Sequence, residues 1–268
     1  MDRLGLDLQS AFGMPPVEYV RLAAELGCSH ITTGLGPVPW NPCGFPPWSL
    51  REDLALRRET TDVMRDLGVV ISVANGFSLK PQADVRDFAA DMDLVAELGA
   101  AQVGTVGIDR DIARSHDQLA HLTEMAVQRG MDVVLDYSPH QAINSLEAAC
   151  AALRHTGSPH ALLSIDAMHF FRAGGAVADL AVLDPALIGY AQLCDVPRVA
   201  RDADYAREAT LERMVPGEGE LPLAEFVAAL PRDVLLGVEV PILSEVEQGA
   251  SVGAILARAV AASRRLLD

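Results

Sequence analysis

Lysine is almost missing from this chain, because Lys80 is the only one and arginine supplies nearly all of the basic charge. Schiff-base enzymes need a desolvated lysine inside the site, and Lys80 lies in the polar stretch SLKPQ, so that chemistry is disfavoured. The GxSxG turn of the serine hydrolases is also absent. The formal net charge of −16 repels nucleic acid phosphates and anionic membranes.

Cysteine pairs and long apolar runs are missing as well. Cys28, Cys43, Cys150 and Cys194 form no CxxC pair, which favours buried free thiols in a reducing compartment over disulfides or a zinc site. The first residues, MDRLGLDLQS, contain no apolar signal core, and no stretch approaches the ~18 apolar residues of a membrane span. We therefore expect a cytoplasmic protein with neither a nucleic acid nor a membrane partner.

Short apolar runs alternate with helical patterns along the whole sequence. The runs cover residues 4–8, 30–34, 69–75, 101–106, 132–137, 161–166, 187–193 and 234–240. The clearest helical patterns cover 15–27, 84–99, 115–130 and 246–267. Strands that are apolar on both faces and separated by helices predict a parallel sheet. Eight such units predict an α/β fold, a single (β/α)8 TIM barrel over residues 1–268. A doubly wound open sheet is the alternative, but its GxGxxG turn is missing.

Oxygen-bearing side chains stand at the ends of the last four predicted strands: Asp136, Asp166, Gln192 and Glu239. In a barrel these strand ends share one rim, and three carboxylates there repel one another unless a cation neutralises them. Oxygen ligands suit Mn²⁺ or Mg²⁺, with Co²⁺ or Zn²⁺ as alternatives. The set therefore predicts one divalent metal ion, although a helix cap explains any one member taken alone.

Further polar residues lie close to these strand ends. His169 follows Asp166 by three residues, which suits either a substrate or proton contact or simple packing. Arg172 and Arg213 are candidates to bind a substrate carboxylate or hydroxyl, with surface placement as the alternative for Arg172. Asp195 either orients a metal ligand or caps a loop.

Two segments are longer than a connection needs, 36–50 and 194–222. Long loops after barrel strands lie at the active-site face. Segment 36–50 contains Trp40, Phe45 and Trp48 and is interpreted either as a lid over a cyclic substrate or as a contact in a homodimer or homotetramer. Phe77 is a candidate for an apolar wall of the substrate site, with ordinary packing as the alternative.

The stretches VVLDYSP, LSIDAMHFFRAGG, YAQLCDVP, ERMVPGEGELPL and LLGVEVP resemble the xylose isomerase-like TIM barrels. The resemblance covers nearly the whole chain and is densest from 132 to 240. It implies that Asp136, Asp166, Gln192 and Glu239 hold one divalent metal ion. It also implies a substrate contact for Arg213, while Glu239, His169 and Asp136 are the groups available to move protons.

The resemblance implies an isomerase or epimerase that acts on a small hydroxy-ketone through an enediolate. Two departures matter: Asp136 replaces the usual glutamate, and Gln192 replaces histidine. Gln192 within QLCD is similar to bacterial 3-dehydroshikimate dehydratases, so a metal-dependent dehydratase is the alternative, with His169 as its base. A barrel that has lost activity and only binds ligands is a third reading. The histidine-rich DNA-repair branch of the family is disfavoured by seven histidines and the acidic charge.

Overall fold

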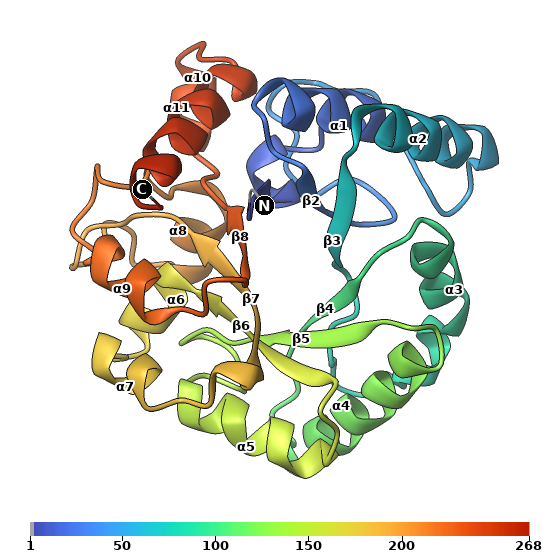
Figure 1. The fold of residues 1–268 in the computed structure, drawn as a ribbon, viewed down its shortest axis with the longest axis vertical. Helices are drawn as coiled ribbons and strands as arrows, with labels where there is room; N and C mark the ends of the chain where they lie inside the picture. The colour runs from blue at the N-terminus through green and yellow to red at the C-terminus, as the bar shows by residue number, and fades with distance from the viewer. Residues whose placement is uncertain (1–2, 268) are drawn as a thin grey trace.

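The computed structural model describes residues 3–267, which form a closed barrel of eight parallel strands inside a layer of helices (Figure 1). The strands, in chain order around the barrel, are β1 Leu4–Leu6, β2 His30–Thr33, β3 Val70–Ala74, β4 Gln102–Val106, β5 Asp132–Asp136, β6 Ala161–Asp166, β7 Ile188–Leu193 and β8 Leu235–Val238. The circle closes where Leu4 of β1 pairs with Leu236 of β8. The predicted (β/α)8 barrel is confirmed, and the open-sheet alternative is wrong.

The helices alternate with the strands and cover the outside of the barrel (Figure 1). They are α1 Pro16–Glu25, α2 Leu54–Leu67, α3 Ala89–Glu97, α4 Ile112–Val127, α5 Leu146–Thr156, α6 Ala167–Arg172, α7 Val177–Ala181, α8 Tyr205–Leu211, α9 Leu223–Ala229, α10 Leu243–Glu247 and α11 Val252–Arg265. Short 3₁₀ turns occupy Leu8–Ala11, Val85–Phe88 and Pro185–Leu187. No helix within residues 3–267 is long and apolar enough to cross a membrane.

Capping side chains explain where these helices begin and end. The Asp53 carboxylate accepts a hydrogen bond from the Leu56 amide (2.9 Å) and starts α2. Gly68 ends the same helix with a φ of 68°, a conformation that costs glycine little. Asp111 caps α4 through the Arg114 amide (3.1 Å), so this helix starts earlier than the 115–130 pattern indicated.

Three further boundaries differ from the sequence pattern. The single helix expected over 246–267 is broken into α10 and α11, because Gly249 turns the chain with a φ of 98° and Ser251 caps a new helix. The first turn of the helix expected over 84–99 is a 3₁₀ turn. The run 4–8 stops being a strand at Leu6, because Asp7 accepts a hydrogen bond from the Gln9 amide and begins a 3₁₀ turn.

The inside of the barrel is closed below its mouth by apolar side chains. Val73, Val134 and Tyr190 are buried there and pack with Leu162 and Leu235. Small residues let neighbouring strands approach closely. A Cβ on Gly5 would lie 2.6 Å from the carbonyl oxygen of His30 on the adjacent strand.

Replacing Gly5 with alanine is expected to lower the free energy of unfolding by about 1–3 kcal/mol, because the added methyl group forces β1 away from β2. Urea denaturation followed by circular dichroism measures the change. Gly253→Ala is the matched control, since the nearest atom to the new Cβ is 3.5 Å away. The control is expected to keep or slightly raise the stability, and an equal loss in both variants would contradict the explanation.

Candidate active site at the barrel mouth

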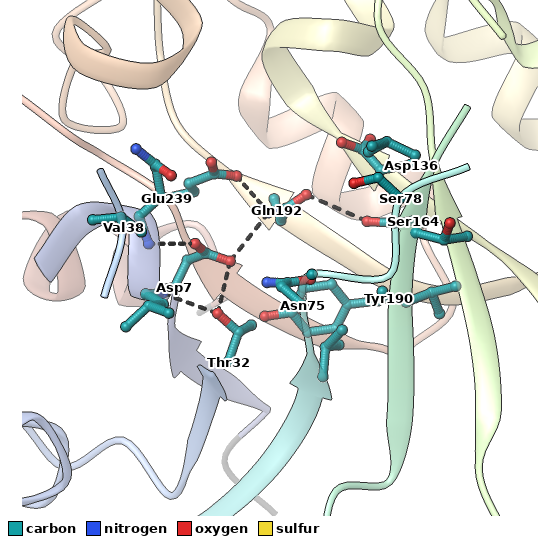
Figure 2. A pocket seen from close by; sticks show the side chains of 18 residues that line it. Asp7, Thr32, Val38, Asn75, Ser78, Asp136, Ser164, Tyr190, Gln192 and Glu239 are labelled. Carbon is teal, nitrogen blue, oxygen red and sulfur yellow. Dashed lines mark hydrogen bonds between the residues drawn. The ribbon is translucent and has the colours of Figure 1, made fainter. Parts of the chain in front are cut away.

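A polar pocket of about 250 Å³ opens at the carboxyl ends of the strands (Figure 2). This volume corresponds to roughly eight water molecules and suits a small substrate. Among the pocket-lining residues that the structure describes, the charged ones are Asp7, Asp136 and Glu239, all acidic. Asp7 follows β1, Asp136 ends β5 and Glu239 follows β8, so barrel closure brings them together.

A network of hydrogen bonds joins side chains at or near the ends of β1, β2, β6, β7 and β8. Figure 2 shows Gln192 between Asp7, Glu239 and Ser164. The Gln192 Nε2 donates to Asp7 Oδ2 (3.2 Å) and makes a short bond to Glu239 Oε2, while its Oε1 accepts from the Ser164 hydroxyl (3.3 Å). Thr32 donates to the same Asp7 oxygen (3.0 Å). The Gln192 amide nitrogen, and not its oxygen, therefore faces the carboxylates.

Arg213 lies behind the pocket and neutralises part of this charge. Its Nη1 is 2.5 Å from Asp166 Oδ2, and its Nη2 is 3.2 Å from Glu239 Oε1. The arginine is 3% exposed, so these ion pairs lie in a medium of low dielectric constant. The other Asp166 oxygen accepts from the His169 amide (2.8 Å) and caps α6. Asp166 is therefore both a helix cap and an ion-pair partner.

His169 is held between two elements. Its Nδ1 lies 2.7 Å from the Tyr205 hydroxyl, and its Nε2 lies 3.9 Å from Asp136 Oδ2. Tyr205 comes from α8, within the long segment 194–222, so this segment reaches over the mouth. Burial lowers the pKa of His169 to about 4, although Asp166 opposes the shift. The imidazole is therefore neutral near pH 7 and able to accept a proton.

Burial disfavours the charged forms of the carboxylates at the mouth. Burial raises the pKa of Asp7 and raises the pKa values of Asp136 and Glu239 well above the ordinary range. Burial acts on Asp166 in the same direction, but Arg213 and His169 outweigh it and lower the pKa of Asp166. Four carboxylates against one guanidinium leave a formal excess of three negative charges, and the mouth favours an added cation or bound protons.

The four predicted ligands fit a divalent ion in their chemistry more closely than in their present arrangement. Asp136, Asp166, Gln192 and Glu239 do meet at one rim, and their oxygens are hard donors. Arg213 and Gln192 already bond to Asp166 and Glu239. Across residues 3–267, no three His, Cys, Asp or Glu side chains are arranged to hold a metal ion. Binding would thus require these hydrogen bonds to rearrange, while the excess negative charge favours it.

Other predicted residues lie away from the pocket. Arg172 donates to the Pro197 carbonyl oxygen (2.8 Å) and to Glu208 Oε1 (3.3 Å), which ties α6 to segment 194–222. Asp195 accepts from three backbone amides, those of Val196, Gly217 and Leu221, so the loop-capping alternative describes its contacts.

The aromatic candidates also lie outside the mouth. Phe77 is buried and packs edge-on against Phe88, with ring centroids 5.4 Å apart. Trp40 is 40% exposed, and Val38 is the part of segment 36–50 that reaches the pocket lining. Trp48 instead bonds through Nε1 to the Gly13 carbonyl oxygen (3.0 Å).

Asp7 and Tyr205 were not among the sequence candidates. Asp7 stood inside the apolar run LGLDL, which hid the fact that the strand ends just before it. Its signal was the same as for the other four: an oxygen donor directly after an apolar strand. Tyr205 lies in a segment whose sequence gave no direction for its side chains.

Comparison with known proteins agrees with the barrel fold. A family model described as "Xylose isomerase-like TIM barrel" matches residues 18–258. The chain belongs to the xylose isomerase-like TIM barrel family. No curated protein matches this family member with significant similarity. The chain also matches 38% of the length of a xylose isomerase-like TIM barrel/4-hydroxyphenylpyruvate dioxygenase fusion protein, at 20% identity over 89% of its own length and a TM-score of 0.73.

Solved structures of similar length share the fold of this xylose isomerase-like barrel. The IolI protein with a bound zinc atom has a TM-score of 0.80 at 17% identity, covering 99% of this chain and 98% of that one. L-ribulose 3-epimerase has a TM-score of 0.75 at 16% identity, covering 100% and 95%. The probable 3-DHS dehydratase AsbF from Bacillus anthracis has 0.74 at 16%, covering 98% and 99%. At these identities the likeness concerns the fold.

Tyr205→Phe is expected to lower the free energy of unfolding by about 1 kcal/mol, because it removes the hydrogen bond to His169. Tyr137→Phe is the matched control, since the buried Tyr137 hydroxyl bonds to no residue that the structure describes. The control is expected to be neutral or stabilising. Paired denaturation curves measure both, and a larger loss at Tyr137 would contradict the assignment.

The His169 imidazole is expected to stay neutral between pH 8 and pH 5, because burial holds its pKa at about 4. NMR of the imidazole carbons as a function of pH measures this. The unfolded chain takes up this proton near pH 6.5, so His169 lowers the stability as the pH falls from about 6.5 to 4. A midpoint near 6.5 in the folded protein would contradict the expected burial effect.

Proposed function

We propose that this barrel is an isomerase or epimerase that depends on a divalent metal ion and acts on a small, uncharged hydroxy-ketone through an enediolate. The observation that carries the proposal is the mouth itself, where Asp7, Asp136 and Glu239 line a small polar pocket and the buried Asp166–Arg213 pair lies behind it. Enolisation requires groups that take and return a carbon-bound proton, and the mouth offers carboxylates of raised pKa for this.

In this proposal Asp136, Asp166, Gln192 and Glu239 hold the ion, with Mn²⁺ or Mg²⁺ favoured and Co²⁺ or Zn²⁺ as alternatives. When bound, such an ion polarises adjacent carbonyl and hydroxyl oxygens and acidifies the carbon-bound proton between them. Support comes from the formal excess of negative charge at this mouth and from the bound zinc of the structurally similar IolI protein.

The chain's own residues divide the proton transfers. Glu239 lines the pocket and is proposed as the base that removes the carbon-bound proton. Asp136, which lines another part of the rim (Figure 2), is proposed to return it. His169 lies 3.9 Å from Asp136 and, being neutral, is able to relay a proton at Nε2. Return to the opposite face of the same carbon gives epimerisation, and return to the next carbon gives isomerisation.

The charge of the pocket favours an uncharged substrate. Of the described residues that line it, none is basic, and Arg213 is buried and already paired with two carboxylates. A substrate carboxylate or phosphate would therefore meet Asp7, Asp136 and Glu239 without a free protein cation. A dehydratase acting on 3-dehydroshikimate is the second candidate, supported by Gln192 within QLCD and by the fold of AsbF.

Metal content is the first test. Purified protein is expected to contain about one divalent ion per chain, measured by mass spectrometry, and Asp136→Ala is expected to lose it. Asp132→Ala is the matched control, because Asp132 stands at the other end of the same strand and pairs with His160. Protein without metal, and with no thermal stabilisation by added divalent ions, would support a barrel that only binds ligands.

Proton exchange tests the reaction itself. With metal present, ketoses in D₂O are expected to exchange the proton next to their carbonyl, followed by NMR, and Glu239→Gln is expected to slow exchange by about 10²–10⁴-fold. The same experiment with 3-dehydroshikimate separates the two candidates. Loss of water from that substrate, without exchange in any ketose, would replace the isomerase by the dehydratase.

A further inference from the structure

Arg213 is held in place by hydrogen bonds of both its side chain and its backbone. Its Nε donates to the Ala209 carbonyl oxygen (2.7 Å), and its backbone amide donates to the Pro241 carbonyl oxygen (2.9 Å). The first bond fixes the side chain against α8, and the second fixes the main chain against the segment that follows β8. The guanidinium therefore has a defined position between Asp166 and Glu239.

Arg213 pairs with two of the carboxylates that are proposed to bind the metal ion. A divalent ion held by Asp166 and Glu239 would need oxygens that Arg213 now contacts through Nη1 and Nη2. The second Glu239 oxygen accepts from Gln192, whose amide oxygen is turned toward Ser164. Asp166 and Glu239 thus have partners within the protein: the Arg213 guanidinium for both, the Gln192 amide for Glu239 and the His169 backbone amide for Asp166.

We propose that Arg213 is an internal counter-cation that competes with the divalent ion for Asp166 and Glu239 and thereby sets the metal affinity of the site. The inference rests on the metal site of the proposed function. Guanidinium and metal carry like charges, and at a separation of a few Å in a buried site their repulsion is large. Metal entry then requires Arg213 to give up at least one carboxylate.

The competition also connects the metal to the segment over the mouth. Arg213 bonds to Ala209 in α8, and the same helix begins with Tyr205, which contacts His169. A shift of the guanidinium therefore acts on the helix that supports the His169 imidazole. Arg213 is in this sense a positioning residue as well as a competitor.

The test is the metal affinity of Arg213→Gln, measured by calorimetric titration of the metal-stripped protein with Mn²⁺. Removing the competing charge is expected to tighten binding at least roughly tenfold over the wild type. Arg213→Lys keeps the charge with fewer donors and is expected to lie between the two. Arg207→Gln is the matched control, because Arg207 lies on α8 and pairs with Asp202 at the surface. It is expected to bind as the wild type does.

Stability provides a readout that is independent of affinity. Without metal, Arg213→Gln is expected to melt below the wild type, because Asp166 and Glu239 lose their partner. Added Mn²⁺ is expected to restore most of that loss and to raise the melting temperature of the variant more than that of the wild type. If Arg213→Gln does not fold, with Mn²⁺ or without it, the expected substitution of metal for arginine is refuted for that variant, and the Lys variant decides the affinity.

The outcomes separate this inference from the proposed function. Unchanged or weaker Mn²⁺ binding in both Arg213 variants would overturn the competition and indicate that the arginine orients the ligands. Ketose exchange by the wild type would still uphold the proposed function in that case. Tight binding by Arg213→Gln with none by the wild type would support the competition while removing the metal from the wild-type reaction. Binding by neither protein would overturn both.

Discussion

Repulsion among carboxylates that share one buried rim is the constraint on which this structure depends. Barrel closure brings Asp7, Asp136, Asp166 and Glu239 from four strands to one mouth, where Asp136 is partly exposed and the other three are buried. One guanidinium, one amide and a few hydroxyls are the groups that hold them there. The fold therefore stores an electrostatic cost at the place where chemistry is expected, as functional sites commonly do.

The long segment 194–222, which follows β7, carries Arg213, the positive partner of these carboxylates. Asp195 accepts hydrogen bonds from the backbone amides of Gly217 and Leu221, and the ion pair between Arg172 and the buried Glu208 holds α8 against α6. These contacts position Arg213 and Tyr205 without any of the anchoring residues touching the pocket. Polar residues near a strand end thus divide into those that face the mouth and those that hold segment 194–222 in place.

The sequence was sufficient for the architecture, because eight short apolar runs alternate with helical patterns along the chain. It also located Asp136, Asp166, Gln192 and Glu239 at one rim, because parallel strands end on the same side. It could not locate Asp7, since a residue inside LGLDL looks like part of the strand until the turn after Leu6 is known. The direction of Arg172, the orientation of the Gln192 amide and the packing of Phe77 depend on tertiary contacts that no local pattern encodes.

The pairing of β1 with β8 has a consequence for the order in which the protein is made. The Leu236 amide bonds to the Arg3 carbonyl oxygen (2.8 Å), and the Asp7 amide bonds to that of Val238 (3.1 Å), so the first strand waits for the last. Before β8 is made, β1 has only β2 as a pairing partner, and Glu239 is missing from the mouth. The bonds of Glu239 to Gln192 and Arg213, and the bond of the Arg213 amide to Pro241, therefore form only when β8 joins the barrel, in the same step that adds the Glu239 charge to the mouth.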